Sequence, residues 1–198
     1  MYPADVDPES GCRLPLPKRE ELDVEAQRIY DTLSDPQGGT LRGLKGPGGI
    51  TLHSPGLSRH SRPLNRYLRY EAGLGGRVRE LAILVTARAL DSQFEWAAHE
   101  TEAGREGIPR EIIDIIRYRR STAELDPADA IVIELGREIF TARRVSPETY
   151  ARALAQFGRR ALIDLVALMG NYAATAALLT AFDMQLDPGR EPPLPMEV

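Results

Sequence analysis

Glu95 and His99 are the residues of this chain whose types and spacing most clearly suggest chemistry. They lie four positions apart, so on a helix their side chains share one face, and Ser92 falls on or near that face. A carboxylate beside an imidazole fixes its tautomer and raises its pKa, which suits general acid–base catalysis near neutral pH. A Glu–His pair on a helix is also common as a surface or capping interaction, so the pattern alone leaves both interpretations open.

Glu80 lies on the preceding predicted helix, residues 77–90. A short connection would fold the two helices antiparallel, with Glu80 and His99 about equally far from the turn. We therefore expect these two side chains to meet, and either Glu80 or Glu95 could hold the imidazole. The three residues could also be metal ligands. Ala103 stands where an HExxH motif has its second histidine, so we expect no metal.

Several segments around these residues form a wider pattern. They are R-x-R-E-L-A-I-L at 77–84, E-W-x-x-H at 95–99, GIPREIID at 107–114, LHSPGLSRH at 52–60 and LVALMGNYAATAALLTAF at 165–182. With this pattern the chain resembles the carboxymuconolactone decarboxylase and alkylhydroperoxidase-D-like family over residues 20–185. The resemblance implies an all-α, alkylhydroperoxidase-D-like bundle of about seven to eight helices that assembles into an oligomer.

The peroxidase branch of that family carries a Cys-x-x-Cys pair, with its thiols seven and four residues before the histidine. In this chain those positions hold Ser92 and Glu95, and the one cysteine, Cys12, lies far outside the motif. Neither replacement can form a disulfide or reduce a peroxide as a thiol, which excludes thiol peroxidase activity. The resemblance therefore favours the decarboxylase branch, which works without a metal or an organic cofactor.

The decarboxylase branch implies a cofactor-free acid–base lyase or isomerase, acting on a small carboxylated lactone or a related enolisable acid. Loss of CO2 from such a lactone leaves a dienolate, which the enzyme must stabilise and protonate on carbon. We assign the proton donation to His99, with Glu95 or Glu80 holding and tuning it. The alternative is a non-catalytic helical oligomer that binds a small ligand or partner.

Four further side chains are candidate substrate contacts, namely Arg77, Arg88, His53 and Ser92. Arginines near a pocket mouth could bind substrate carboxylates as bidentate forks, although a solvated surface arginine is the plainer interpretation of Arg77 and Arg88. His53 lies in a glycine-rich loop, where it could face the active site or fix the loop by bonding backbone groups.

The elements that must position these residues are helices, and no stretch shows the alternation of a strand. Apolar spacing with proline and glycine boundaries predicts helices over 22–33, 57–71, 77–90, 92–104, 109–118, 127–142, 147–156 and 159–183. Ser92 and Glu95 match an S-x-x-E capping box. Residues 1–20 contain four prolines and predict an extended N-terminal arm, followed by a single all-α domain over 21–198.

Composition limits the classes of partner. The 198 residues carry a net charge of −4, which does not suggest nucleic-acid binding, and one cysteine excludes a disulfide framework. The N-terminus lacks the apolar core of a signal peptide, so we expect a cytoplasmic protein.

Residues 165–182 are uncharged but rich in alanine, which favours a buried or interface helix over a membrane span. Along this helix the small residues Gly170, Ala174, Ala177 and Ala181 allow a second helix to approach closely. We therefore expect a homo-oligomer, with a dimer ranked first and a trimer or hexamer next.

Overall fold

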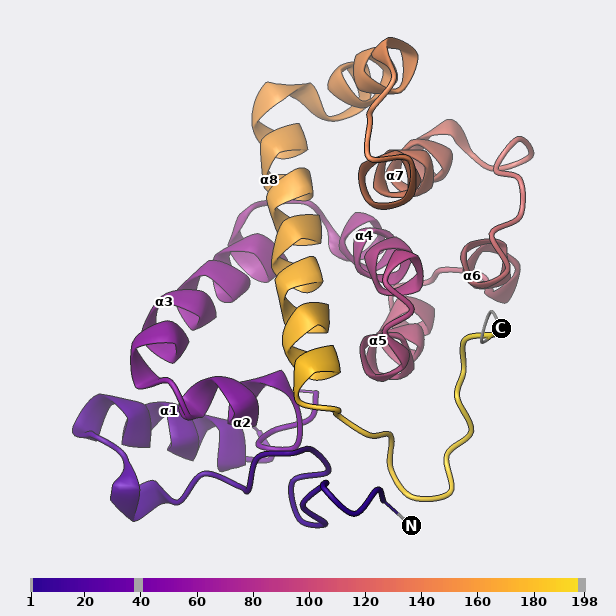
Figure 1. The fold of residues 1–198 in the computed structure, drawn as a ribbon. Helices are drawn as coiled ribbons and strands as arrows, with labels where there is room; N and C mark the ends of the chain where they lie inside the picture. The colour runs from indigo at the N-terminus through magenta and orange to yellow at the C-terminus, as the bar shows by residue number, and fades with distance from the viewer. Residues whose placement is uncertain (1, 38–40, 196–198) are drawn as a thin grey trace. The chain divides into compact units, whose positions relative to one another are not determined.

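The computed structural model describes residues 2–37 and 41–195, and its regular elements there are all helices (Figure 1). Helices make up 64% of the structure, which confirms the predicted all-α class. The chain divides into two compact units. The first comprises the described parts of 1–65 and 177–191, and the second those of 66–176 and 192–198.

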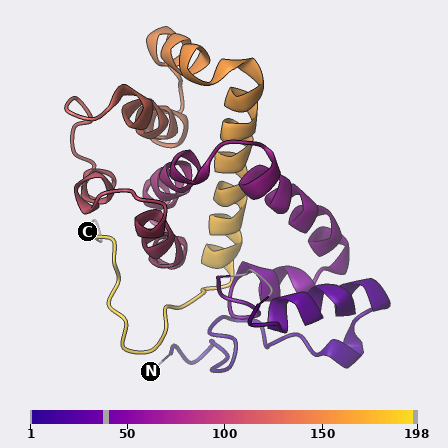
Figure 2. The ribbon, with the colours of Figure 1, turned by 180° about the vertical axis from the view of Figure 1, so that it is seen from behind.

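The first unit contains α1 (Val24–Ser34), α2 (Pro47–Leu52) and most of α3 (Pro55–Arg66). Asp23 caps α1, because its carboxylate accepts a hydrogen bond of 2.8 Å from the amide of Ala26. A small core of Ala26, Leu33 and Leu52 joins α1 to α2, which lie side by side in both views (Figures 1 and 2). The sequence predicted a glycine-rich loop where α2 forms. Gly38 and Gly39, which were expected to stop the first helix from continuing, lie outside the described residues.

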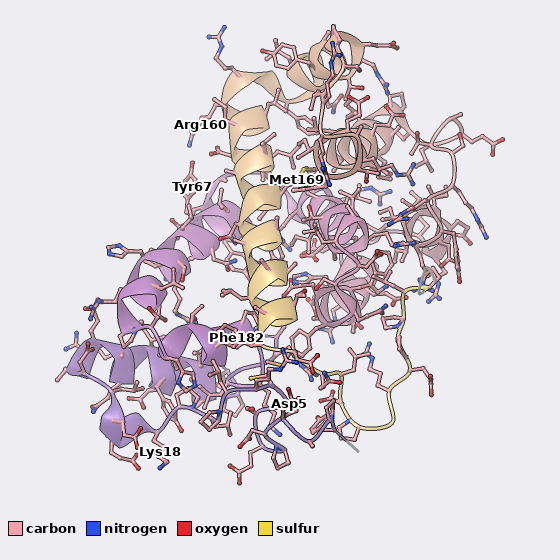
Figure 3. The ribbon with its side chains drawn as sticks, in the orientation of Figure 1. Asp5, Lys18, Tyr67, Arg160, Met169 and Phe182 are labelled. Carbon is pink, nitrogen blue, oxygen red and sulfur yellow. The ribbon has the colours of Figure 1, made fainter. Side chains whose placement is uncertain are left out.

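The N-terminal segment differs from the expected extended arm. The amide of Asp7 donates to the Cys12 carbonyl at 2.8 Å, and Val6 and Cys12 are buried. The amide of Arg13 then donates to the carbonyl of Phe182, labelled in Figure 3, also at 2.8 Å. The segment packs because its turns provide hydrogen-bond partners for the backbone and its few apolar side chains are buried. The predicted single domain over 21–198 stays a prediction.

The second unit is built around one central helix. Its helices are α4 (Gly76–Ala89), α5 (Gln93–Arg105), α6 (Arg110–Arg117), α7 (Pro127–Arg137) and α8 (Pro147–Ala181) up to residue 176. Helix α4 packs against α5, α6 and α7 (Figures 1 and 2). The crossing with α7 is close because Gly136 lacks a side chain, since a Cβ there would lie 2.4 Å from Cγ1 of Val85. Trp96 is fully buried in this core.

Two of the predicted helices end in π-helices. The first π-helix, Tyr67–Glu71, follows α3, and the second, Glu138–Ala142, follows α7. The helices predicted over 147–156 and 159–183 are one span, α8, but Gly158 interrupts it with φ 71° and ψ 169°. Only glycine adopts these angles without strain, and the chain changes direction there (Figure 1).

Helix α8 is the one helix of the described residues that is long and apolar enough to cross a membrane, and 44% of its most apolar window is buried. Core helices of soluble proteins share these features, so this is weak evidence for a span. The small residues Gly170, Ala174, Ala177 and Ala181 are all exposed among the described residues.

Candidate active site

Helices α4 and α5 bring Glu80 and His99 into direct contact inside the second unit. Oε2 of Glu80 lies 2.7 Å from Nδ1 of His99, and the two residues are 0% and 3% exposed. This hydrogen bond confirms the predicted contact and identifies Glu80 as the glutamate bonded to the imidazole. An ionised carboxylate only accepts hydrogen bonds, so Nδ1 carries a hydrogen and the neutral ring presents Nε2 as its basic nitrogen.

Arg79 holds the other oxygen of the Glu80 carboxylate. Its Nε donates to Oε1 of Glu80 at 3.0 Å, and its Nη2 donates to Glu106 at 2.7 Å. Burial alone would raise the pKa of Glu80, but its hydrogen bond and charge interaction with His99 outweigh this, together with the hydrogen bond from Arg79 and the charge of Arg69. The pKa of Glu80 therefore lies below its usual value, and the group stays ionised at neutral pH.

Glu95 faces the opposite nitrogen of the same imidazole. Its Oε2 lies 3.8 Å from Nε2 of His99, too far for a hydrogen bond, and has no hydrogen-bond partner among the described residues. Burial raises the pKa of Glu95, and its electrostatic interactions with His99 and Arg69 offset this only in part. One imidazole thus stands between an ionised glutamate and one with a raised pKa, the separation that acid–base sites use to divide their roles.

Tyr172 of α8 closes one side of the imidazole. Its ring meets that of His99 edge to face, with centroids 5.1 Å apart and planes at 87°. Burial raises the pKa of Tyr172 above its usual value, so the phenol stays neutral. The ring limits the space around His99 without adding charge.

Arg69, on the first π-helix, is a residue that the sequence reasoning missed. Its Nε is buried without a hydrogen-bond partner among the described residues, and its guanidinium lies 4.9 Å from the ring centroid of Tyr70. Tyr67 helps to fix this π-helix, because its hydroxyl donates to Asp164 of α8 at 3.3 Å, next to Arg160 (Figure 3). Arginine is abundant in this chain, and nothing in the local sequence distinguishes Arg69.

The two predicted substrate-binding arginines are used in contacts between elements of the second unit. Arg77 donates from Nε and Nη2 to the carboxylate of Asp129 at 2.9 and 2.6 Å, and from Nη1 to the Gly107 carbonyl at 2.8 Å. Arg88 is 3% exposed and donates from Nε to the carbonyl of Arg117 at 2.7 Å. Arg88 is therefore not the solvated residue of the plainer interpretation, and the bonds of Arg77 explain its presence without a substrate.

Ser92 contradicts one expectation, and His53 matches one of the two roles left open for it. Ser92 is the N-cap residue of α5, but its side chain makes no capping bond and its amide donates to Ala87 at 2.8 Å. The predicted capping box is wrong because the Glu95 carboxyl turns toward His99 instead. His53 belongs to the first unit, is exposed, and has its Nε2 2.9 Å from the Pro15 carbonyl, the contact expected of a residue that fixes a loop.

Among residues 2–37 and 41–195, no group of three or more His, Cys, Asp or Glu side chains is arranged to hold a metal ion. Comparison of the chain with protein-family models and with curated proteins gives no match.

Proposed function

We propose that the protein is a cofactor-free acid–base lyase or isomerase resembling carboxymuconolactone decarboxylase, which acts in the cytoplasm on a small carboxylated lactone or related enolisable acid. The observation that carries this proposal is the placement of His99. Its Nδ1 is held by Glu80 at 2.7 Å, and its Nε2 faces Glu95 at 3.8 Å. A degradation step for an aromatic compound would supply such a lactone.

Glu80 and Glu95 have different roles in this proposal. Glu80 is a positioning residue, because it fixes the ring and stabilises the imidazolium. Loss of CO2 breaks a carbon–carbon bond, and its electron pair moves through the ring to the lactone carbonyl oxygen as a dienolate. Nε2 of the neutral ring carries no hydrogen, so Glu95, whose pKa burial raises, passes its proton to Nε2. His99 then delivers this proton to carbon, and a proton from solvent restores neutral Glu95.

The test is turnover of carboxymuconolactone, followed by loss of its ultraviolet absorbance and by release of CO2. His99→Gln should lower kcat/KM by about 10²- to 10⁴-fold, the usual contribution of a general acid. His60→Gln is the matched control, because His60 is exposed on α3 and belongs to the first unit. Absence of turnover by the unmodified protein, or turnover that survives His99→Gln, would contradict the proposal.

A second candidate function is a non-catalytic homo-oligomer that binds a small ligand or partner. The burial of the Glu80, Glu95 and His99 side chains and the exposed apolar residues of α8 favour it. Glu80, Glu95 and His99 are each at most 4% exposed, as in a structural network. On α8, Ile163 is 63% exposed and Val166 39%, a surface that a second copy could cover. Light scattering during size-exclusion chromatography tests the assembly, and a monomer of 21.9 kDa would contradict it.

A further inference from the structure

Two buried polar atoms near His99 have no hydrogen-bond partner among the described residues. One is Oε2 of Glu95, and the other is Nε of Arg69. They belong to neighbouring groups, because the charge of Arg69 acts on Glu95, Glu80 and Tyr172, yet they are not bonded to each other. A buried donor or acceptor without a hydrogen bond costs about 1–3 kcal/mol. A bound group that forms hydrogen bonds with both residues would remove this cost.

We propose that Arg69 and Glu95 form the carboxylate-binding end of the His99 site, and that the site takes a small organic carboxylate. This inference rests on the proposed function for its role in turnover, whereas the binding it describes can be measured alone. Arg69 donates from its guanidinium to the ligand carboxylate. Glu95 in its neutral form donates its O–H to the same carboxylate, and His99 then lies beside the adjoining carbon.

The surrounding charges explain why Arg69 is the arginine that binds. The guanidinium of Arg79 is bonded to Glu80 and Glu106, and that of Arg77 to Asp129. Arg117 also has an unpartnered Nε, but its terminal nitrogens pair with Glu100 and Asp114. Within the part of the chain that the structure describes, no carboxylate pairs with Arg69, so its charge is left for an anion.

The first π-helix places the guanidinium at the edge of the buried site. Nη1 of Arg79 donates to the Arg69 carbonyl at 3.1 Å, which ties the π-helix to the residue that holds Glu80. The Tyr70 ring lies 4.9 Å from the guanidinium of Arg69 and 5.5 Å from that of Arg79, and Tyr70 is 57% exposed. The guanidinium of Arg69 therefore lies against a ring that is exposed to solvent.

The experiment is a titration of the full-length protein with succinate, read from the ring resonances of its three histidines by NMR. Succinate should shift the His99 signals saturably and leave those of His53 and His60 in place, whereas succinamide, its neutral analogue, should shift none. Arg69→Gln should raise the Kd for succinate about tenfold or more, because a charge-assisted bond is lost. Arg66→Gln is the matched control, since Arg66 directly precedes the π-helix and is 78% exposed.

Equal shifts with succinate and succinamide, or a Kd that Arg69→Gln leaves unchanged, would overturn the inference. If Arg69→Gln does not fold, Arg69→Lys is measured in its place. Lysine keeps the charge but lacks the planar guanidinium that binds a carboxylate through two hydrogen bonds. A Kd for succinate that Arg69→Lys leaves unchanged would also overturn the inference. Succinate binding that depends on Arg69 without any lactone turnover would refute the proposed function alone. Turnover that requires His99 but not Arg69 would refute this inference alone.

Discussion

The two π-helices of the second unit have the same length and opposite polar environments. In the second, the Glu138 carboxylate accepts hydrogen bonds from the Ser146 amide at 2.6 Å, the Thr149 hydroxyl at 2.7 Å and the Ser146 hydroxyl at 3.2 Å. In the first, Nε of Arg69 is buried without a partner among the described residues. The Glu138 carboxylate of the second π-helix has its hydrogen-bond partners within the fold, whereas the Arg69 donor of the first has none there.

The difference separates a structural use of the π-helix from a functional one. The Ser146 hydroxyl accepts from the amide of Thr149 at 3.1 Å, so Glu138 supports the residue that caps α8. A π-turn inserts an extra residue and redirects the side chains around it, and such turns are frequent at functional sites. We therefore expect changes at Arg69 to affect binding and turnover, and changes at Glu138 to affect stability.

The largest effect expected to distinguish the two π-helices is on turnover by Arg69→Gln. Loss of a charge-assisted bond to the substrate carboxylate should lower kcat/KM for carboxymuconolactone by about 10- to 100-fold. The melting temperature should change little, because only the contact of the guanidinium with the exposed Tyr70 ring is lost. Glu138→Gln is the reciprocal control and should leave kcat/KM unchanged. If the two variants lower turnover equally, the distinction between the two π-helices fails.

The next effect is on stability through Glu138. Glu138→Gln places an amide donor against the donors of Ser146 and Thr149, and should lower the free energy of unfolding by about 1–2 kcal/mol at pH 7. The backbone hydrogen bond from Ser146 lowers the pKa of Glu138 despite some desolvation. The unmodified protein should therefore be more stable than Glu138→Gln above the ordinary glutamate pKa. This difference in stability should disappear as pH falls through the lowered pKa of Glu138. A urea-unfolding series from pH 7 to pH 3 measures this, and a difference that does not depend on pH would contradict it.

Glu95 should show the opposite dependence on pH. Burial raises the pKa of Glu95, so the folded protein holds a proton that the unfolded chain releases, and stability falls as pH rises above the ordinary glutamate value. Glu95→Gln should raise the melting temperature by about 2–4 °C at pH 8. The gain should disappear near pH 4. The exposed Glu111→Gln should show no such trend, and a Glu95→Gln variant that is less stable at pH 8 would contradict the neutral-acid role.

The sequence predicted the helices of the second unit and the Glu80–His99 contact, because both depend on local spacing. Apolar periodicity located α4 and α5, and counting from the turn between them paired the two residues. The sequence could not predict the π-helices, since the apolar pattern continues through Tyr67–Glu71 as it would in an α-helix. Nor could it separate Arg69 from Arg77. The partner of Arg77 is Asp129, 52 residues away, and Arg69 differs because its Nε has no hydrogen-bond partner in the described part of the chain.

The last effect tests the packing just before the second π-helix. A Cβ at Gly136 would lie 2.4 Å from Cγ1 of Val85, so Gly136→Ala should cost about 1–2 kcal/mol of stability by pushing α7 away from α4. Gly170→Ala is the matched control, because a Cβ at this helical position meets nothing within 4 Å. It should stabilise the protein by about 0.5–1 kcal/mol, the difference in helix propensity. Chemical unfolding of both variants measures the contrast, and an equal response would mean that Val85 yields and the close helix crossing does not constrain this π-helix.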